Sequence, residues 1–168
     1  MAPLRQGVVH QLHPGDVAVA TRGERLETLL GSCIGILLTD PRRTVGGLCH
    51  VVHAGRAGTG ATQPTAYGDD ALRALFTLLR RLGIEPRLCG AWVFGGGHLF
   101  PGRVGGTATE GHVGAANAQW AMRALLEQGI ELLGGEFGGH AWRRLTWIVG
   151  PGQPELQVMP VQAEGARS

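Results

Sequence analysis

The sequence predicts a mixed α/β (α+β) fold in a single domain covering residues 1–168. Two segments place apolar residues at helical spacing, and several short apolar runs end at Gly or Pro, as strands do. With 43% hydrophobic and 17% charged residues, a chain of 168 residues can bury one sizeable core. Many of the 29 glycines fall as doublets or triplets between the apolar runs, which indicates tight turns.

Two helices are predicted, and each is followed by a glycine that ends it. The first covers Gly68–Gly83, with Asp69 and Asp70 in its opening turn, and the second covers Asn117–Gly129. Each carries one apolar stripe and is therefore expected to pack against a sheet. The stripes consist of Leu72, Leu75, Phe76, Leu79 and Leu82 in the first helix, and of Ala118, Ala121, Met122, Leu125 and Leu126 in the second.

The remaining apolar runs are short and read as strands. The predicted strands are Glu27–Leu38, Thr44–His53, Arg87–Phe94, Ile130–Gly135, Arg144–Val149 and Glu155–Val161. Two long segments without periodicity, His53–Gly68 and Phe100–Gly114, are predicted to be loops. Long loops in a compact domain are often functional, so both are candidates for flanking a substrate.

Composition argues against several classes of protein. The formal net charge is +2, and the basic residues are scattered without an aromatic-interleaved stripe, so nucleic acid is not an expected partner. All fifteen basic residues are arginine, which excludes Schiff-base chemistry by a lysine of this chain. No window approaches about eighteen uninterrupted apolar residues, and the N-terminus lacks a charged segment followed by a long apolar one. We therefore expect no membrane insertion and a cytoplasmic location.

Cys33 is the first candidate for chemistry, because it follows a Gly-Ser turn and precedes an apolar run. A cysteine in this position is either a small buried hydrophobe or a nucleophile presented by the turn. A nucleophilic thiol needs a partner that accepts its proton, and His50 lies in the next predicted strand, where antiparallel pairing would bring it within reach. Thr28 precedes both; its hydroxyl either orients substrate or histidine, or its side chain merely fills a strand. The turn also offers backbone N–H groups for an oxyanion.

A zinc site is an alternative, because metal-binding residue types gather near the same place. Adjacent Cys49 and His50 would point to opposite faces of a strand, and the C-x-x-C spacing of most zinc sites is absent, so the cysteine–histidine pair is favoured. The residues considered for zinc are Cys33, Cys49, His50 and His53, with a second pair at His10 and His13. Substrate binding is an alternative role for His98, His112 and His140, which lie in or beside glycine-rich segments.

Several motifs occur in the order and spacing of the CheD family, which the sequence resembles from Thr28 to Val149. They read TLLGSCIGILLTDP, GGLCH, YGDDALRALFTLLRRLGI, VFGGGHLF, VGAANAQ, LLEQGIELLGGEFGG and RRLTW. The chain departs from the family pattern at Cys49, where members commonly have Asn, and at Ala116, where they have Arg.

The resemblance implies a cysteine hydrolase with a layered sandwich fold, in which stacked β-sheet is flanked by helices, similar to the catalytic domain of deamidating cytotoxic necrotizing toxins. It implies that Cys33 is the nucleophile, His50 the base and Thr28 the third catalytic group. The implied reaction converts glutamine side chains of methyl-accepting chemotaxis receptors to glutamate. It requires neither a metal nor an organic cofactor.

Two other functions are compatible with the sequence. The resemblance implies the phosphatase CheC as a possible partner, so the chain could act as a CheC-binding adaptor with reduced catalysis. Leu99 and Phe100, after the glycine triplet, are candidates for such a surface. A different Cys-His hydrolase, acting on esters or small amides, would share the same pair. The presence of both Cys33 and His50 favours an enzyme over an adaptor.

Overall fold

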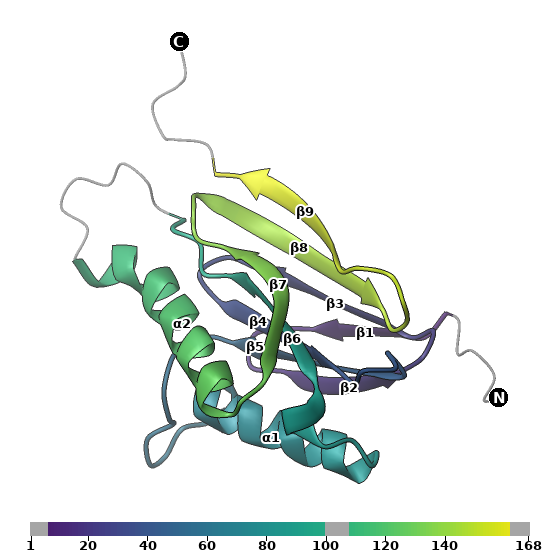
Figure 1. Ribbon diagram of the computed structural model, residues 1–168. Coiled ribbons are helices and arrows are strands. Elements are labelled where there is room, and N and C mark those ends of the chain that lie inside the picture. The colour runs from purple at the N-terminus through teal and green to yellow at the C-terminus, as the bar shows by residue number, and fades with distance from the viewer. Residues whose placement is uncertain (1–6, 100–107, 162–168) are drawn as a thin grey trace.

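The computed structural model describes residues 7–99 and 108–161. They form two stacked sheets with both helices on one side (Figure 1). The outer sheet has the order β1-β3-β8-β9, and the central sheet, between it and the helices, has the order β2-β5-β4-β6-β7. The bounds are β1 Val9–Leu12, β2 Val17–Thr21, β3 Arg25–Leu30, β4 Ile34–Thr39, β5 Val45–Val51, α1 Gly68–Arg81, β6 Gly90–Gly95, α2 Ala108–Glu127, β7 Glu131–Phe137, β8 Ala141–Ile148 and β9 Glu155–Pro160. The expected layered α+β sandwich is confirmed.

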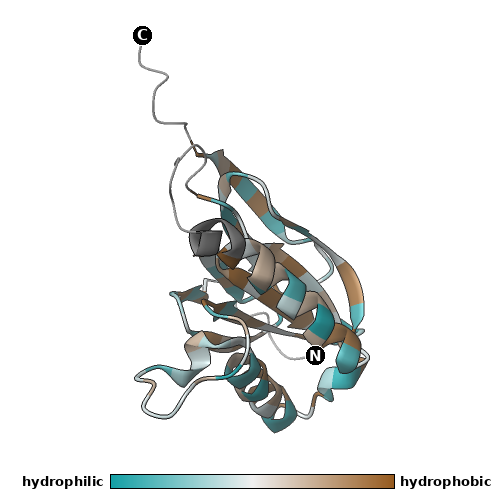
Figure 2. Ribbon diagram, turned by 90° about the vertical axis from the view of Figure 1, so that its left-hand side faces the viewer, coloured by the Kyte–Doolittle hydropathy of each residue, from teal (hydrophilic) through white to brown (hydrophobic). Residues whose placement is uncertain are grey.

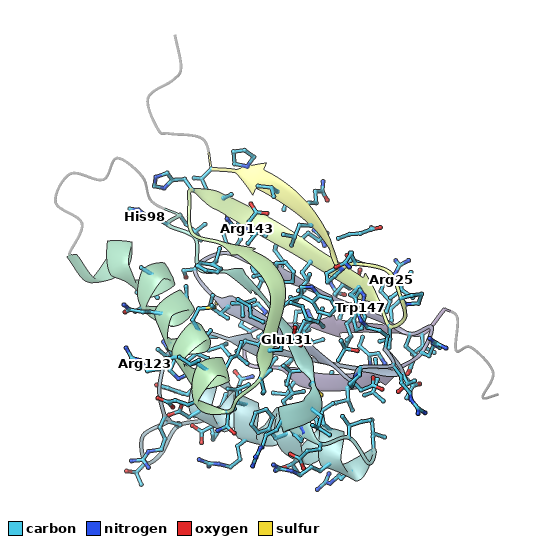
Figure 3. All side chains as sticks on the ribbon, viewed as in Figure 1. Arg25, His98, Arg123, Glu131, Arg143 and Trp147 are labelled. Carbon is cyan, nitrogen blue, oxygen red and sulfur yellow. The ribbon has the colours of Figure 1, made fainter. Side chains whose placement is uncertain are left out.

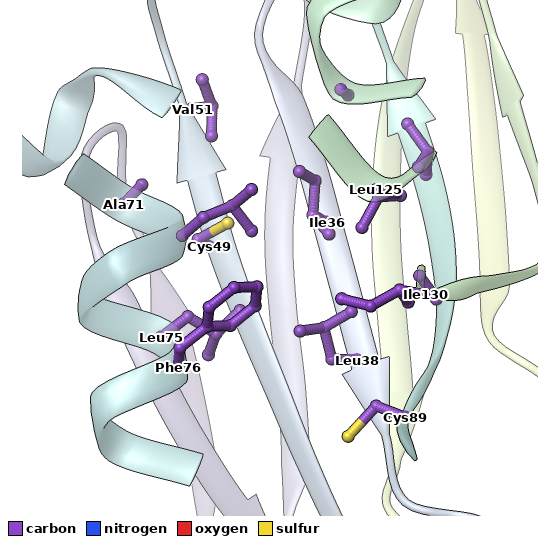
Figure 4. Packing of buried hydrophobic residues seen from close by; sticks show 14 of the residues in the cluster. Ile36, Leu38, Cys49, Val51, Ala71, Leu75, Phe76, Cys89, Leu125 and Ile130 are labelled. Atoms are coloured by element: carbon purple, nitrogen blue, oxygen red, sulfur yellow. The ribbon is translucent and has the colours of Figure 1, made fainter. Parts of the chain in front are cut away.

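The helical layer and the central sheet enclose one half of the core. Leu75 and Phe76 of α1 pack onto β5 and β4 beside Cys49 and Leu38 (Figure 4). Leu125 of α2 joins the same cluster. Figure 2 shows hydrophobic residues concentrated on the strands behind the helices. Each fully buried leucine of this kind contributes about 1.5–3 kcal/mol to the free energy of unfolding.

A second cluster fills the space between the two sheets. Leu26 of β3 and Trp147 of β8 face Leu48 of β5 across it, and the ring of Trp147 lies 5.3 Å from that of Trp92. Every residue of β4 and β5 is buried, because these strands have a hydrophobic layer on each face. The functional residues described below lie at one end of this inter-sheet cluster.

The predicted strand Glu27–Leu38 is wrong as a single strand. The chain leaves the outer sheet at Leu30 and enters the central sheet at Ile34, so the segment forms two strands, β3 and β4, in different sheets. Both halves carry leucine or isoleucine and contact hydrophobic layers, so the apolar pattern did not reveal the change of sheet. The three residues Gly31–Cys33 make the crossover, and Cys33 therefore lies at a corner of the sandwich.

Other predicted boundaries also changed. The helix predicted at Gly68–Gly83 is confirmed as α1, but the one predicted at Asn117–Gly129 begins earlier, at Ala108. The described part of the predicted loop Phe100–Gly114 therefore belongs to α2, and Phe100 lies outside the described residues. The strand predicted from Arg87 starts only at Gly90, after a short 3-10 helix at Pro86–Leu88.

Strands β1 and β2 were not predicted. They are only four and five residues long, and polar or small residues interrupt their apolar pattern. Their pairing partners, β3 and β5, supply the order that the local sequence lacks. Within residues 7–99 and 108–161, neither helix has the length and apolar character needed to cross a bilayer.

Candidate active site

Two backbone hydrogen bonds hold Cys33 at the crossover. The N–H of Gly96 donates to the Cys33 carbonyl at 2.9 Å, and the N–H of Gly97 donates to the Gly31 carbonyl at 2.9 Å. Cys33 is half-buried, whereas Cys49 and Cys89 are buried. Cys33 is therefore the least buried of the three cysteines.

His50 shares a face of the central sheet with Cys33. It lies opposite Gly35 in the antiparallel pairing of β4 with β5. The predicted antiparallel pairing of these two strands is therefore confirmed. Alternation along β5 directs Leu48 and His50 toward the outer sheet and Cys49 toward the helices. Cys33 packs against the same inter-sheet cluster as Leu48. Cys33, just before β4, and His50 of β5 thus lie on the same face of the central sheet.

Thr28 approaches His50 from the opposite sheet. Its Oγ1 lies 2.7 Å from His50 Nδ1 and 2.8 Å from the carbonyl oxygen of Leu12 in β1. A carbonyl can only accept, so the single hydroxyl proton of Thr28 is donated to Leu12, and Nδ1 must then be the donor to Oγ1. This arrangement places the imidazole proton on Nδ1 and leaves the Nε2 lone pair free.

The environment keeps His50 neutral. Burial lowers its pKa from 6.5 to about 4; the Asp16 carboxylate opposes this effect and His13 adds to it. His50 is only 1% exposed, and its Nε2 has no hydrogen-bond partner among the described residues. A buried nitrogen without a hydrogen-bond partner costs folding free energy. Such unsatisfied groups are common at sites where a reaction takes place.

Burial also raises the pKa of the Cys33 thiol, while its own backbone N–H partly offsets this by stabilising the thiolate. A neutral thiol and a neutral imidazole suit proton transfer to Nε2 during attack rather than a preformed ion pair. Burial raises the pKa of Cys49 to about 12 and that of Cys89 to about 11. These two thiols are therefore far less suited to nucleophilic chemistry.

The zinc ligand set does not assemble among the described residues. Cys49 points away from His50, and His53 stacks on Tyr67 with ring centroids 4.9 Å apart. His10 and His13 each lie beside a carboxylate, of Glu24 and Asp16 respectively, rather than beside each other. In residues 7–99 and 108–161 no group of three or more metal-type side chains converges.

Two other histidines, His98 and His140, lie near the turn that holds Cys33. His98 and His140 face each other with ring centroids 5.2 Å apart, and His140 Nδ1 lies 3.1 Å from the His98 carbonyl. His112, expected in a loop, falls within α2. Leu99 is half-buried and lies, with Trp142, against the Cα of Gly31.

Sequence reasoning missed Arg143, which anchors the turn that holds Cys33. It is 3% exposed, and its guanidinium donates to the carbonyls of Gly95 and Gly138 at 3.2 and 2.6 Å. Figure 3 places Arg143 and His98 at the same end of the sandwich. A charged residue at an inward position of β8 was the available signal, but a sequence does not reveal which carbonyls such a residue reaches.

Asn117 was also missed as a site residue. It lies on the buried side of α2, four and eight residues before Ala121 and Leu125, so a polar residue on an apolar stripe was the signal. Its side-chain Nδ2 donates to the carbonyls of Ser32 at 3.1 Å and Val52 at 3.0 Å. These carbonyls lie beside the nucleophile candidate and at the end of the strand that carries His50.

A cavity of about 900 Å³ lies at the other end of the outer sheet. It is lined by backbone and side chains that include Val9, Arg22, Arg25 and Ile148. Among the described residues no thiol or imidazole lines this cavity, so its size does not locate the chemistry. The Thr28–His50 contact, and the half-buried Cys33 against the same inter-sheet cluster, make the corner of the sandwich the candidate active site.

Comparison with known proteins supports a family assignment. The family model described as CheD chemotactic sensory transduction matches residues 53–157. A protein of Albidiferax ferrireducens named probable chemoreceptor glutamine deamidase CheD 2 is 35% identical, covering 89% of this chain and 87% of its own length. One of Thermococcus kodakarensis, named probable chemoreceptor glutamine deamidase CheD, is 35% identical over 85% of this chain and 88% of its own.

A crystal structure of Neisseria meningitidis protein NMB0706, of the family model DUF152, covers 88% of this chain and 76% of its own, at 12% identity and a TM-score of 0.45. That similarity is too low to carry an argument. The family model begins after Thr28, Cys33 and His50, but the two curated relatives cover most of both chains. On the model match and these relatives together, the chain belongs to the CheD family.

Proposed function

We propose that this protein is a glutamine deamidase that converts glutamine side chains of chemoreceptors to glutamate, with Cys33 as nucleophile and His50 as base. The observation that carries the proposal is the free Nε2 of His50, fixed by the Thr28 hydroxyl on the face of the central sheet that Cys33 shares. Membership of the family supports the receptor substrate, because relatives are named chemoreceptor glutamine deamidases.

The proposed reaction begins with transfer of the Cys33 proton to Nε2 of His50. The sulfur attacks the side-chain amide carbon of glutamine, a C–S bond forms, and the carbonyl π electrons move onto oxygen. As that oxygen re-forms its double bond, the C–N bond breaks and the nitrogen takes the proton from His50, so ammonia leaves. A thioester remains on Cys33.

Water completes the proposed cycle. His50 accepts a proton from water, whose oxygen attacks the thioester carbon, and the C–S bond then breaks. The proton returns to sulfur, so glutamate is released and the thiol is regenerated. Amide and water are consumed and acid and ammonia are formed, with groups of this chain alone. Thr28 acts in both halves by keeping the proton on Nδ1.

The location of Cys33 suits a large protein substrate. It lies in the crossover between sheets and is half-buried, so a glutamine side chain on a folded surface can reach it without entering a deep cavity. Trp142, 40% exposed on the outer sheet, and Leu99 both lie against Gly31 of the same crossover. These apolar groups are available to contact a helix that carries the target glutamine.

Peptide mass spectrometry tests the proposal directly. Incubation with the cytoplasmic part of a receptor from the same organism is expected to convert specific glutamines to glutamates. Cys33→Ala should abolish conversion, whereas Cys89→Ala, which removes a thiol elsewhere, should retain it. Receptor or CheC binding with every glutamine unchanged would contradict the enzyme and favour the adaptor. Turnover of small esters or amides alone would contradict the receptor substrate.

A further inference from the structure

One amide group ties the two strands of the candidate active site together. The Asn117 side chain is 2% exposed, and both hydrogens of its NH2 group are used, on the carbonyls of Ser32 and Val52. Two carbonyl acceptors require the NH2 end of the amide, so the orientation of the side chain is unambiguous. Ser32 immediately precedes the nucleophile candidate, and Val52 follows the strand of His50.

Holding the Ser32 carbonyl also sets the direction of the Cys33 N–H. In a planar trans peptide the C=O of one residue and the N–H of the next point in opposite directions. With the Ser32 oxygen drawn toward Asn117, the N–H of Cys33 must point away from α2. In the described part of the chain this N–H donates to no other residue, and it lies near its own sulfur, where it stabilises the thiolate.

The neighbouring backbone makes this direction rigid. The carbonyls of Gly31 and Cys33 are held by Gly97 and Gly96, so both sides of the Ser32–Cys33 peptide are fixed. Helix α2 comes close enough for Asn117 to reach because Gly114, one turn earlier, has no side chain. A Cβ there would lie 2.5 Å from the carbonyl oxygens of Gly96 and Gly97.

We propose that Asn117 is a positioning residue that aims the backbone N–H of Cys33 at the substrate oxygen on which negative charge develops. The inference rests on the proposed Cys33 chemistry and adds the element that orients its oxyanion donor. As the C–S bond forms, the carbonyl π electrons move onto oxygen, and the N–H donates a hydrogen bond to it while no bond to the N–H breaks. Pre-oriented donors of this kind lower the barrier because they need no reorganisation during the reaction.

Two reactions of the same sulfur separate this role from a merely structural one. Iodoacetamide alkylates Cys33 by displacing iodide, and no oxyanion forms. p-Nitrophenyl acetate acylates Cys33 through a tetrahedral oxyanion and needs no receptor. The variants are Asn117→Asp, which keeps the shape and loses both donors, and Asn117→Ser, a milder change. Gln119→Glu, an exposed amide-to-carboxylate change on the same helix, is the matched control.

The expected result is a divergence of the two rates. In Asn117→Asp the acylation rate should fall about 100- to 1000-fold while alkylation stays within about threefold of wild type, and Gln119→Glu should change neither. Parallel loss of both rates, or retention of both, overturns the inference; Asn117→Ser decides the question should Asn117→Asp not fold. The wild type could also leave receptors unchanged while Asn117→Asp still loses acylation and keeps alkylation. That outcome supports the inference and refutes only the receptor substrate.

Discussion

The Thr28 hydroxyl lies 2.7 Å from Nδ1 of His50, although the two residues belong to different sheets. The contact therefore exists only when the outer and central sheets are stacked. Because the same hydroxyl donates to the Leu12 carbonyl, stacking also selects the tautomer of His50 that leaves Nε2 unprotonated. The packing of the two sheets therefore both forms the core and sets the tautomer of His50 that can accept a proton.

Replacing Thr28 tests this coupling. Thr28→Val keeps the shape and removes the hydroxyl, so Nδ1 of His50 loses its acceptor and the Leu12 carbonyl its donor. We expect the deamidation rate to fall at least about tenfold, because the imidazole is no longer held in its basic tautomer. The free energy of unfolding should fall by about 1–3 kcal/mol, because two buried polar groups lose their partner.

Thr28→Ser is the matched variant, since it restores the hydroxyl and removes only a methyl group. Its deamidation rate, measured by mass spectrometry of receptor peptides, should lie much closer to wild type. Equal losses in the valine and serine variants would show that the methyl group, and not the hydrogen bond, matters at this position.

The three thiols should differ in reactivity. At neutral pH iodoacetamide is expected to label Cys33 first, because Cys49 and Cys89 are buried and their pKa values are raised to about 12 and about 11. His50→Ala should slow labelling of Cys33 by removing the group that accepts its proton. Peptide mapping over time provides the measurement, and faster labelling of Cys89 than of Cys33 would refute the assignment.

Protonation of His50 should destabilise the fold in a defined pH window. Its pKa is about 4 when folded against an ordinary 6.5, so between these values the unfolded chain binds a proton that the folded chain does not. The free energy of unfolding should therefore decrease as the pH falls from about 6.5 to about 4, by roughly 3 kcal/mol in total from this group. Above pH 6.5 its contribution is constant.

Urea denaturation at a series of pH values measures this dependence. His50→Gln, which cannot titrate, should show a flatter curve across the same window. An identical slope in wild type and His50→Gln would mean that other groups cause the loss. His140→Gln is the comparison, because His140 is exposed, lies outside the inter-sheet cluster and does not act on the pKa of His50.

Gly114 should not tolerate a methyl group despite its helical position. On helix propensity alone, Gly114→Ala would stabilise α2 by about 1 kcal/mol. The added Cβ would, however, lie 2.5 Å from two backbone oxygens that cannot move cheaply, so steric overlap should win, with a net destabilisation of about 1–3 kcal/mol. Gly58→Ala is the control, because a Cβ at Gly58 meets nothing within 4 Å. Thermal melting that ranks Gly114→Ala at or above wild type would contradict the close packing.

The sequence by itself determined the features that depend on short-range pattern. The apolar stripe of α1 repeats over a few residues, so its extent could be predicted to within two residues of Gly68–Arg81. The strand of His50 was predicted for the same reason, and its short connection to the preceding strand indicated the antiparallel pairing that the structure contains. Cys33 and His50 could therefore be chosen as candidates, because pairing between sequential strands is local.

Tertiary structure alone decided where the two sheets divide and which polar groups meet there. The run from Glu27 to Leu38 carries leucine or isoleucine in both of its strands, although Leu29 of β3 is exposed, so composition could not locate the crossover at Gly31–Cys33. The bonds from Asn117 to Ser32 and Val52 join residues 85 and 65 positions apart. Contacts at such separation depend on how whole layers pack, and no periodicity in the chain encodes them.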